Sequence, residues 1–197
     1  KYVSQYTVDN NHSMSFDGTN DYFSLNSINL GTTNTISFWY NGEAITYSAV
    51  LGSDDAPNDY TIWVDNNGTH IAYKVQAPNS TPVVNWNITS INDGNWHHLA
   101  FSRINTTINL YIDGNLQTVN SNSLVNNDTK IDTIGAKTDG SYPFKGELDE
   151  VAFFNKALTA DQIKFEIYEA STTANKSADF INNPNLPDPV AWYRMGD

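Results

Sequence analysis

The chain contains no cysteine among its 197 residues, so no disulfide can hold its fold together. Basic residues are scarce as well: ten Lys and Arg stand against 22 Asp and Glu, a formal net charge of −12. A field of that sign repels phosphate backbones and anionic membranes, so we expect no nucleic-acid partner. No apolar run approaches the roughly 20 residues of a membrane span, so we expect no membrane insertion.

Apolar residues recur at every second position in several segments, which is typical of half-buried β-strands. Three such sets are Ile36, Phe38 and Tyr40; Ile71, Tyr73 and Val75; and Ile108, Leu110 and Ile112. Asp-Gly and Asn-Gly pairs separate the segments, and these pairs tolerate the positive φ of tight hairpins. Short strands at this spacing predict an all-β sandwich, and a chain of this length can bury a core of its own.

One helix is indicated, over about residues 160–170. Thr159 and Gln162 have the spacing of a capping box, in which each side chain bonds the other residue's backbone N–H. Ile163, Ile167 and Ala170 then share one face of the helix. We expect this face to pack on an edge or rim of a sheet.

Two longer stretches carry a family resemblance. One is residues 95–103 (NWHHLAFSR), followed by 109–114 (NLYIDG), and the other is 146–159 (GELDEVAFFNKALT). They resemble the laminin-G-like jelly roll of the concanavalin A-like superfamily, in its pentraxin-like bacterial and viral branch, including modules of marine phage structural proteins. The resemblance spans about residues 13–168. It implies a two-sheet antiparallel jelly-roll sandwich with one short C-terminal helix, in a module that usually binds glycans or proteins.

The expected organisation is one jelly-roll domain over residues 1–170. Residues 171–197 are rich in Asn, Ser and Pro, which predicts an extended connection followed by a terminal strand around Trp192. The chain begins at Lys1 rather than Met, so we expect a piece of a larger protein, with another module following. The resemblance places such a protein outside the cell, or on the surface of a virion or cell.

A glycoside hydrolase is the enzyme class to weigh, because the related family 16 enzymes carry Glu-x-Asp-x-x-Glu on one strand. Here Glu147 and Asp149 match the first two positions, but Ala152 occupies the third. Strand alternation predicts that Glu150 points to the opposite face. Retaining hydrolysis needs two carboxyl groups about 5–5.5 Å apart. We therefore predict no catalytic residue.

Exposed aromatic side chains are the candidates for ligand binding, because an aromatic face stacks on the C–H groups of a sugar. The predicted binding residues are Trp63, Trp86, Tyr47, Tyr60 and Tyr73. Plain packing within the sheet is the simpler alternative for Trp63 and Trp86. Trp39 and Trp96 fall on the strands that carry the family resemblance, so we expect both to pack in the core.

Calcium is the candidate cofactor, because many modules of this kind hold it with loop carboxylates and carbonyl oxygens. Two clusters could supply the ligands. One is Asp54, Asp55 and Asp59; the other is Asp17, Asn20 and Asp21 together with Asp149, if the opening hairpin pairs near the last long strand. Acidic loops that simply form turns are the alternative.

The preferred hypothesis is a non-catalytic recognition or adhesion module for cell-surface or extracellular glycan. The alternative is a structural or decoration module of a virion or surface fibre that contacts neighbouring structural proteins. A homo-oligomer within such an assembly is a further option. Glycoside hydrolysis is disfavoured by Ala152.

Overall fold

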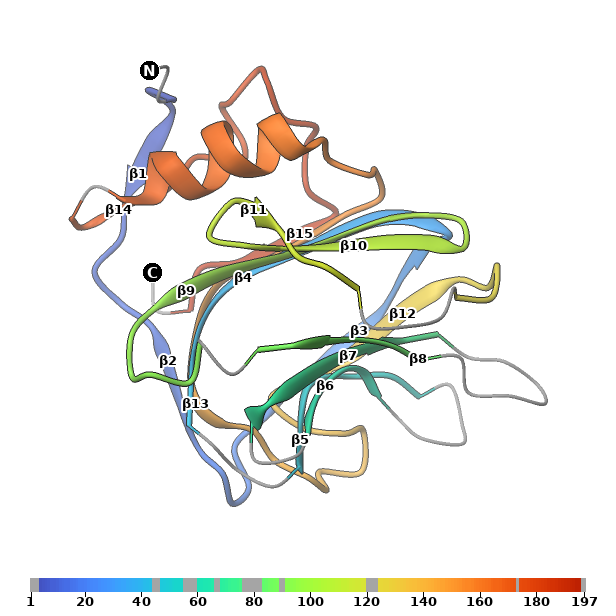
Figure 1. Cartoon of the computed structure of the whole chain (residues 1–197). Coiled ribbons are helices and arrows are strands. Elements are labelled where there is room, and N and C mark those ends of the chain that lie inside the picture. The colour runs from blue at the N-terminus through green and yellow to red at the C-terminus, as the bar shows by residue number, and fades with distance from the viewer. Residues whose placement is uncertain are drawn as a thin grey trace.

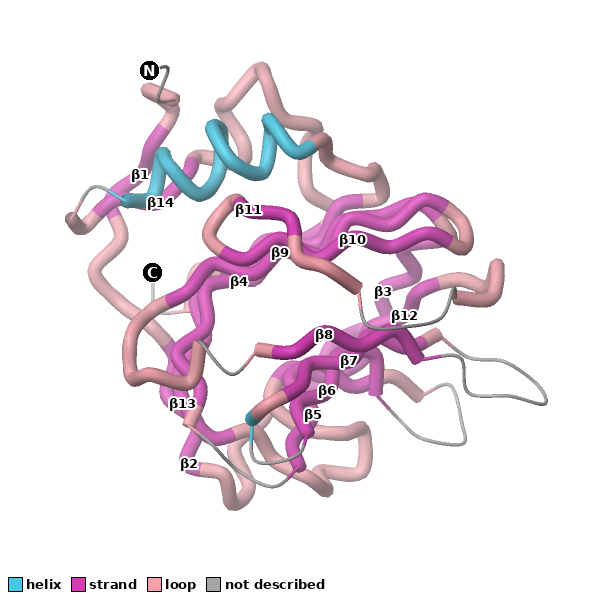
Figure 2. The backbone as a smooth tube through the Cα atoms, viewed as in Figure 1, coloured by secondary structure: helices cyan, strands magenta, loops and turns pink. Residues whose placement is uncertain are grey.

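The computed structural model describes residues 4–43, 47–54, 60–65, 68–75, 83–88, 91–119, 124–172 and 174–195. Two antiparallel sheets pack face to face, and a helix covers the outer side of one of them (Figures 1 and 2). The predicted jelly-roll sandwich is thereby confirmed. Among the described residues, no helix has the length and apolar character needed to cross a bilayer.

The first sheet has seven described strands, and the helix lies on its outer face. In spatial order they are β11 (Asn115–Leu116), β10 (Thr107–Ile112), β9 (His97–Ile104), β4 (Thr33–Gly42), β13 (Lys145–Phe154) and β15 (Ala191–Tyr193), with β2 (Met14–Asp17) also paired to β13. The second sheet has six. They are β3 (Phe23–Gly31), β12 (Thr129–Ile134), β5 (Tyr47–Gly52), β6 (Tyr60–Asp65), β7 (His70–Lys74) and β8 (Val83–Asn87).

The main core lies between the sheets, where the predicted alternation is confirmed. Ile36, Phe38 and Tyr40 of β4 are fully buried there. They face side chains of the second sheet such as Tyr73, whose ring lies 5.6 Å from that of Phe101 on β9. Strands with one face in the core present their other face outward, and this geometry decides which residues can form a surface site.

A second apolar layer lies between the first sheet and the helix, which runs as η2 (Gln162–Tyr168, π type) and η3 (Glu169–Thr172, 3₁₀ type). The predicted capping box is confirmed: Thr159 N–H donates to Gln162 Oε1 at 3.0 Å, and Gln162 N–H donates to Thr159 Oγ1 at 3.2 Å. Ile163 and Ile167 are buried against Ala152 of β13. The predicted apolar face packs on the outer face of the first sheet, over β9, β10 and β13, so the expected position at an edge or rim is wrong.

The C-terminal segment packs on the sandwich instead of leaving it. β14 (Lys176–Ala178) pairs with β1 (Thr7–Asp9) in a two-stranded sheet beside the helix. β15 then pairs with β13, which confirms the predicted terminal strand. The two ends of the described chain are thus both tied to the first sheet and its outer layer.

Strand β13 contains a β-bulge at its centre. Asp149 pairs with Trp39 of β4 and Ala152 with Ser37, so β13 holds one more residue than β4 over this interval. Glu150 has a φ of 52°, in the left-handed region. Because of the bulge, Asp149 and Glu150 both lie on the outer face, while Leu148 and Val151 enter the core. The prediction that Glu150 points to the opposite face is therefore wrong.

Replacing Thr159 by Ala removes one half of the capping box. We expect the free energy of unfolding to fall by about 1 kcal/mol, because a backbone N–H at the helix start loses its acceptor. Chemical denaturation measures this change. Thr106→Ala, in the exposed turn between β9 and β10, is the matched control and should leave stability nearly unchanged. Equal effects of the two substitutions would contradict the role given to the cap.

Candidate functional site

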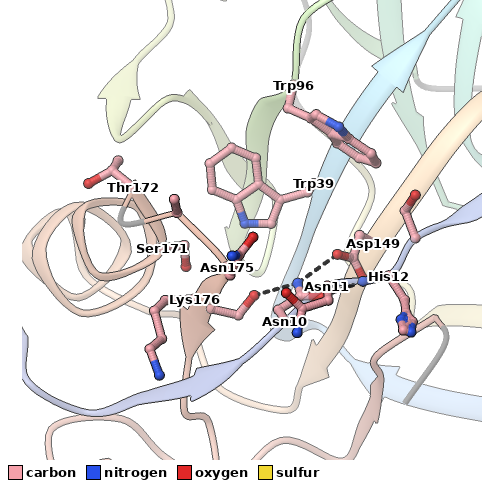
Figure 3. Close-up of a pocket in the computed structure, with 13 residues that line it drawn as sticks. Asn10, Asn11, His12, Trp39, Trp96, Asp149, Ser171, Thr172, Asn175 and Lys176 are labelled. Atoms are coloured by element: carbon pink, nitrogen blue, oxygen red, sulfur yellow. Dashed lines mark hydrogen bonds between the residues drawn. The ribbon is translucent and has the colours of Figure 1, made fainter.

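A pocket of about 410 Å³ opens where the first sheet meets the outer layer. This volume lies in the range of small-ligand sites. The sheet contributes Trp39 of β4, Trp96 just before β9, and Asp149 of β13. The outer layer contributes residues 10–13, which connect β1 to β2, together with residues 171–172 and 174–177. Figure 3 shows both indole rings on one side of this space, with Asn10, Asn175 and Asp149 facing it.

The two tryptophans are placed differently from the sequence prediction. Trp39 points to the outer face of β4, where its ring lies 5.5 Å from His98 and 6.0 Å from Tyr168 of the helix. Trp96 is 37% exposed. Both rings line the pocket, so the prediction that they pack in the core is wrong. Strand parity was the available signal, because Trp39 alternates with the core residues Phe38 and Tyr40.

His98 packs against Trp39 on the outer face of the first sheet. It is fully buried, and its Nε2 lies 2.8 Å from Ser37 Oγ. Burial lowers the pKa of His98 to about 4, so the imidazole is neutral at physiological pH. His97, in contrast, pairs with Asp113 at 2.7 Å and Asp93 at 3.3 Å. The two imidazole rings thus have different partners, Ser37 for His98 and the two aspartates for His97, as their positions in the strand predict.

The floor of the pocket is a network of hydrogen bonds around Asp149. Asn10 Nδ2 donates to Asp149 Oδ2 and also lies 2.7 Å from Ser177 Oγ, each bond spanning most of the chain length. Asp149 Oδ1 accepts from the backbone N–H of Glu150 at 2.7 Å. The Asn10 N–H donates to the carbonyl of Asn175 at 3.1 Å. Segments from both ends of the chain are therefore held in place around one carboxylate.

Glu150 lies directly behind this floor and is nearly fully buried. Its Oε2 accepts from the indole N–H of Trp192, and Arg194 Nε lies 3.6 Å from its Oε1. Burial, followed by the charge of Asp149, raises the pKa of Glu150 to about 7. The bulge therefore places a carboxyl group that titrates near neutrality between the sheet and the terminal strand.

The aromatic residues predicted to bind ligand separate into two groups. Tyr47, Tyr60 and Trp63 do come together on the outer face of the second sheet, with ring centroids 5.9 Å and 4.7 Å from that of Trp63. Trp86 and Tyr73 are fully buried between the sheets, so their assignment to an exposed surface is corrected. Alternation along β7 and β8 turns both side chains inward.

The structure also shows whether the residues of one predicted calcium cluster lie close together. Asp17 pairs with Lys145, whereas Asp149 lies four residues further along β13. At about 3.3 Å per residue, this register separates Asp17, Asn20 and Asp21 from Asp149, and the cluster does not fit one cation. Asp55 and Asp59 lie outside the described residues; Asp54 is described, and its N–H donates to Asp132 Oδ2. Within the described residues, no group of three or more His, Asp or Glu could hold a metal ion.

Comparison with known proteins identifies the family. Residues 17–164 match the family described as the Concanavalin A-like lectin/glucanases superfamily, and the chain belongs to this family. The family predicted from the sequence motifs is thereby confirmed. The chain is 26% identical over 140 residues to the Adhesion G-protein coupled receptor V1 of Danio rerio, covering 66% of this chain and 2% of the receptor.

Solved structures with the same fold include three that cover between 78% and 96% of this chain. A Bacteroides ovatus protein assigned to carbohydrate binding aligns with a TM-score of 0.65 and 14% identity, over 96% of this chain and 53% of that one. A heptameric SAP-like pentraxin from Limulus polyphemus gives 0.56 and 14%, over 96% and 92%. The CBM40 of the Ruminococcus gnavus IT-sialidase, solved with α2,3-sialyllactose, gives 0.56 and 12%, over 78% and 95%. At these identities the likeness concerns the fold alone.

Glu150 makes stability depend on pH. Its pKa is about 7 in the folded chain against 4.5 as the ordinary value, so its contribution to stability is complete below pH 4.5 and is lost as the pH rises through 7. Replacement by Gln keeps an acceptor for Trp192 but removes the titration. Between about pH 5 and about pH 8, wild type should lose roughly 2 kcal/mol of unfolding free energy relative to Glu150→Gln. Denaturant titrations across this range measure the difference, and parallel pH profiles would contradict the assignment.

Proposed function

We propose that this chain is a non-catalytic carbohydrate-recognition module and that the pocket between Trp39 and Trp96 binds one or two sugar units. The observation that carries the proposal is the pairing of two indole rings with amide, hydroxyl and carboxylate groups in one pocket. A pyranose presents C–H groups on its faces and hydroxyl groups at its edge. The rings can stack on the first, and Asn10, Asn175 and Asp149 can bond the second.

The relatives support the same class of function. The Bacteroides ovatus protein is assigned to carbohydrate binding, and the Ruminococcus gnavus module was solved with a sialylated oligosaccharide. The zebrafish relative is an adhesion receptor, of which this chain matches a small part. We extend these properties to the chain as a proposal: recognition of glycan by one module of a larger protein that acts outside the cell or on a surface.

The carboxylates of β13 favour binding over hydrolysis. Glu147 accepts from Ser13 Oγ at 3.4 Å and from Asn41 Nδ2 at 3.2 Å, so structural contacts hold it. Glu150 is buried against Trp192, and Ala152 provides no acid. A retaining hydrolase needs a free nucleophile and a free acid on either side of the scissile bond. The contacts proposed for the sugar are stacking on the indole rings and hydrogen bonds to Asn10, Asn175 and Asp149. Calcium binding stays a prediction.

The test is a glycan array, followed by calorimetry on the strongest neutral ligand, with and without calcium. We expect Trp96→Ala to weaken binding by roughly twofold to tenfold, since a lost aromatic stacking contact is worth about 0.5–1.5 kcal/mol. Trp96 is the better position than Trp39, because Trp39 also supports the helix. Asp149→Asn tests the polar side of the same pocket.

Leu116→Ala is the matched control, because Leu116 is 60% exposed on β11 and does not line the pocket. It should bind like wild type. An array without any ligand for the folded wild type would reject the recognition function and favour the structural module of a virion or fibre. Equal affinity of the ligand for Trp96→Ala and wild type would show that this pocket is not the binding site.

A further inference from the structure

The outer face of the second sheet carries a second group of aromatic side chains, on the side of the sandwich away from the helix (Figure 1). We call it the aromatic–lysine cluster, and it consists of Tyr47, Tyr60, Trp63, Tyr142 and Lys137. Trp63 lies at its centre. The tyrosine rings lie 4.7–5.9 Å from it, two of them nearly parallel to the indole.

The sheet leaves room for this arrangement. Trp63 pairs with Ala49 on β5 and Ala72 on β7, and both small side chains belong to the same outer cluster. The indole itself is only 9% exposed, because its neighbours cover it. Tyr47 and Tyr142, in contrast, are 51% and 47% exposed. The cluster therefore has a rigid centre and two rings that face solvent.

A hydrogen-bonded turn presents the other two members. Gly140 N–H donates to the Lys137 carbonyl at 2.9 Å, and Lys137 N–H donates to the Ser141 carbonyl at 3.1 Å. Ala49 N–H then donates to the carbonyl of Tyr142 at 2.9 Å, which fixes the turn to β5. Tyr142 has a φ of 51°, a conformation rare for an aromatic residue and common at ligand sites.

Lys137 holds its ammonium group among the rings. The Nζ atom lies 4.4 Å from the ring of Tyr142, 5.5 Å from Trp63 and 6.0 Å from Tyr60. Within the described residues it makes no ion pair with a carboxylate. The nearby Asp139 accepts from the Ser141 N–H at 2.9 Å as part of the turn. Lys74 Nζ lies 4.9 Å from the ring of Tyr60 as well, so in a chain of net charge −12 this cluster has a local positive charge.

We propose that the aromatic–lysine cluster is a second binding site, specific for a sugar that carries a carboxylate, such as a uronic acid unit of an acidic polysaccharide. The exposed rings of Tyr47 and Tyr142 stack on the pyranose, and the Lys137 ammonium bonds the carboxylate. No calcium ion takes part. This site is separate from the pocket proposed above, because its residues lie on the opposite outer face from Trp39 and Trp96. Both sites are proposed to bind carbohydrate.

The experiment compares acidic oligosaccharides with their methyl esters, which keep the sugar and remove the charge. The panel contains oligogalacturonate, oligoglucuronate and sialyl-lactose, each with its ester, measured by calorimetry in EDTA. The measurements are made at physiological ionic strength, where salt screens the repulsion between the acidic protein and an acidic ligand beyond about 8 Å. We expect at least one acid to bind and its ester to bind at least about tenfold more weakly, as for the loss of a charged hydrogen bond.

Variants decide whether the binding belongs to this site. Lys137→Met should weaken the acid about tenfold or more and leave the ester unchanged, whereas Lys137→Arg should retain most of the affinity. Tyr142→Ala should weaken both ligands. Lys156→Met, at an exposed lysine two residues after the end of β13, is the matched control. The array ligand of the Trp39–Trp96 pocket should bind Lys137→Met normally, which separates the two proposals.

Four results would overturn the proposal. The first is a panel in which no acidic oligosaccharide binds the folded wild type. The second is equal binding of an acid and its ester. The third is an equal loss of affinity in Lys137→Met and Lys156→Met. The fourth is binding that disappears in EDTA and returns with calcium.

Discussion

The bulge in β13 is the constraint on which the outer layer of this protein depends. One extra residue between the pairs of Asp149 and Ala152 turns two consecutive carboxylates to the same face of the sheet. Asp149 then accepts a hydrogen bond from Asn10 in the N-terminal segment, and Glu150 accepts one from Trp192 in the C-terminal strand. Both ends of the described chain are thereby fastened to the middle of one strand.

The same contacts create the candidate site. Asn10 also bonds Ser177, which holds the connection between β1 and β2 against β14. Opposite this connection stands Trp39, fixed by His98 and the helix. The pocket is the space that remains between them. Two adjacent buried carboxylates are costly unless each has hydrogen-bond partners, and the raised pKa of Glu150 records that cost.

The sequence predicts the regular parts of this structure well. Alternation in β4 and the Thr159–Gln162 capping box are local patterns, and both hold in the structure. The bulge has no such signature, since Glu150 is an ordinary residue in an unusual conformation. Strand alternation therefore no longer predicts which face a residue of β13 takes beyond the bulge, as the position of Glu150 shows.

The sites depend on long-range register, which a single sequence does not contain. Trp63 and Tyr47 do come together, because neighbouring strands carry them. Trp86 is equally aromatic but faces the core with Val84 and Ile88, and its alternation with Asn85 and Asn87 was the signal for that face. The pocket joins residues near 10, 39, 96, 149 and 175, which no local motif could bring together.

The central claim is that a sugar binds between Trp39 and Trp96, and the indole N–H signals of the five tryptophans test it directly. A titration of ¹⁵N-labelled protein with the strongest neutral array ligand would follow these signals by NMR. The account predicts that the Trp39 and Trp96 signals shift with one common Kd, while that of buried Trp86 stays in place. Shifts confined to Trp63, Trp86 or Trp192 would contradict it.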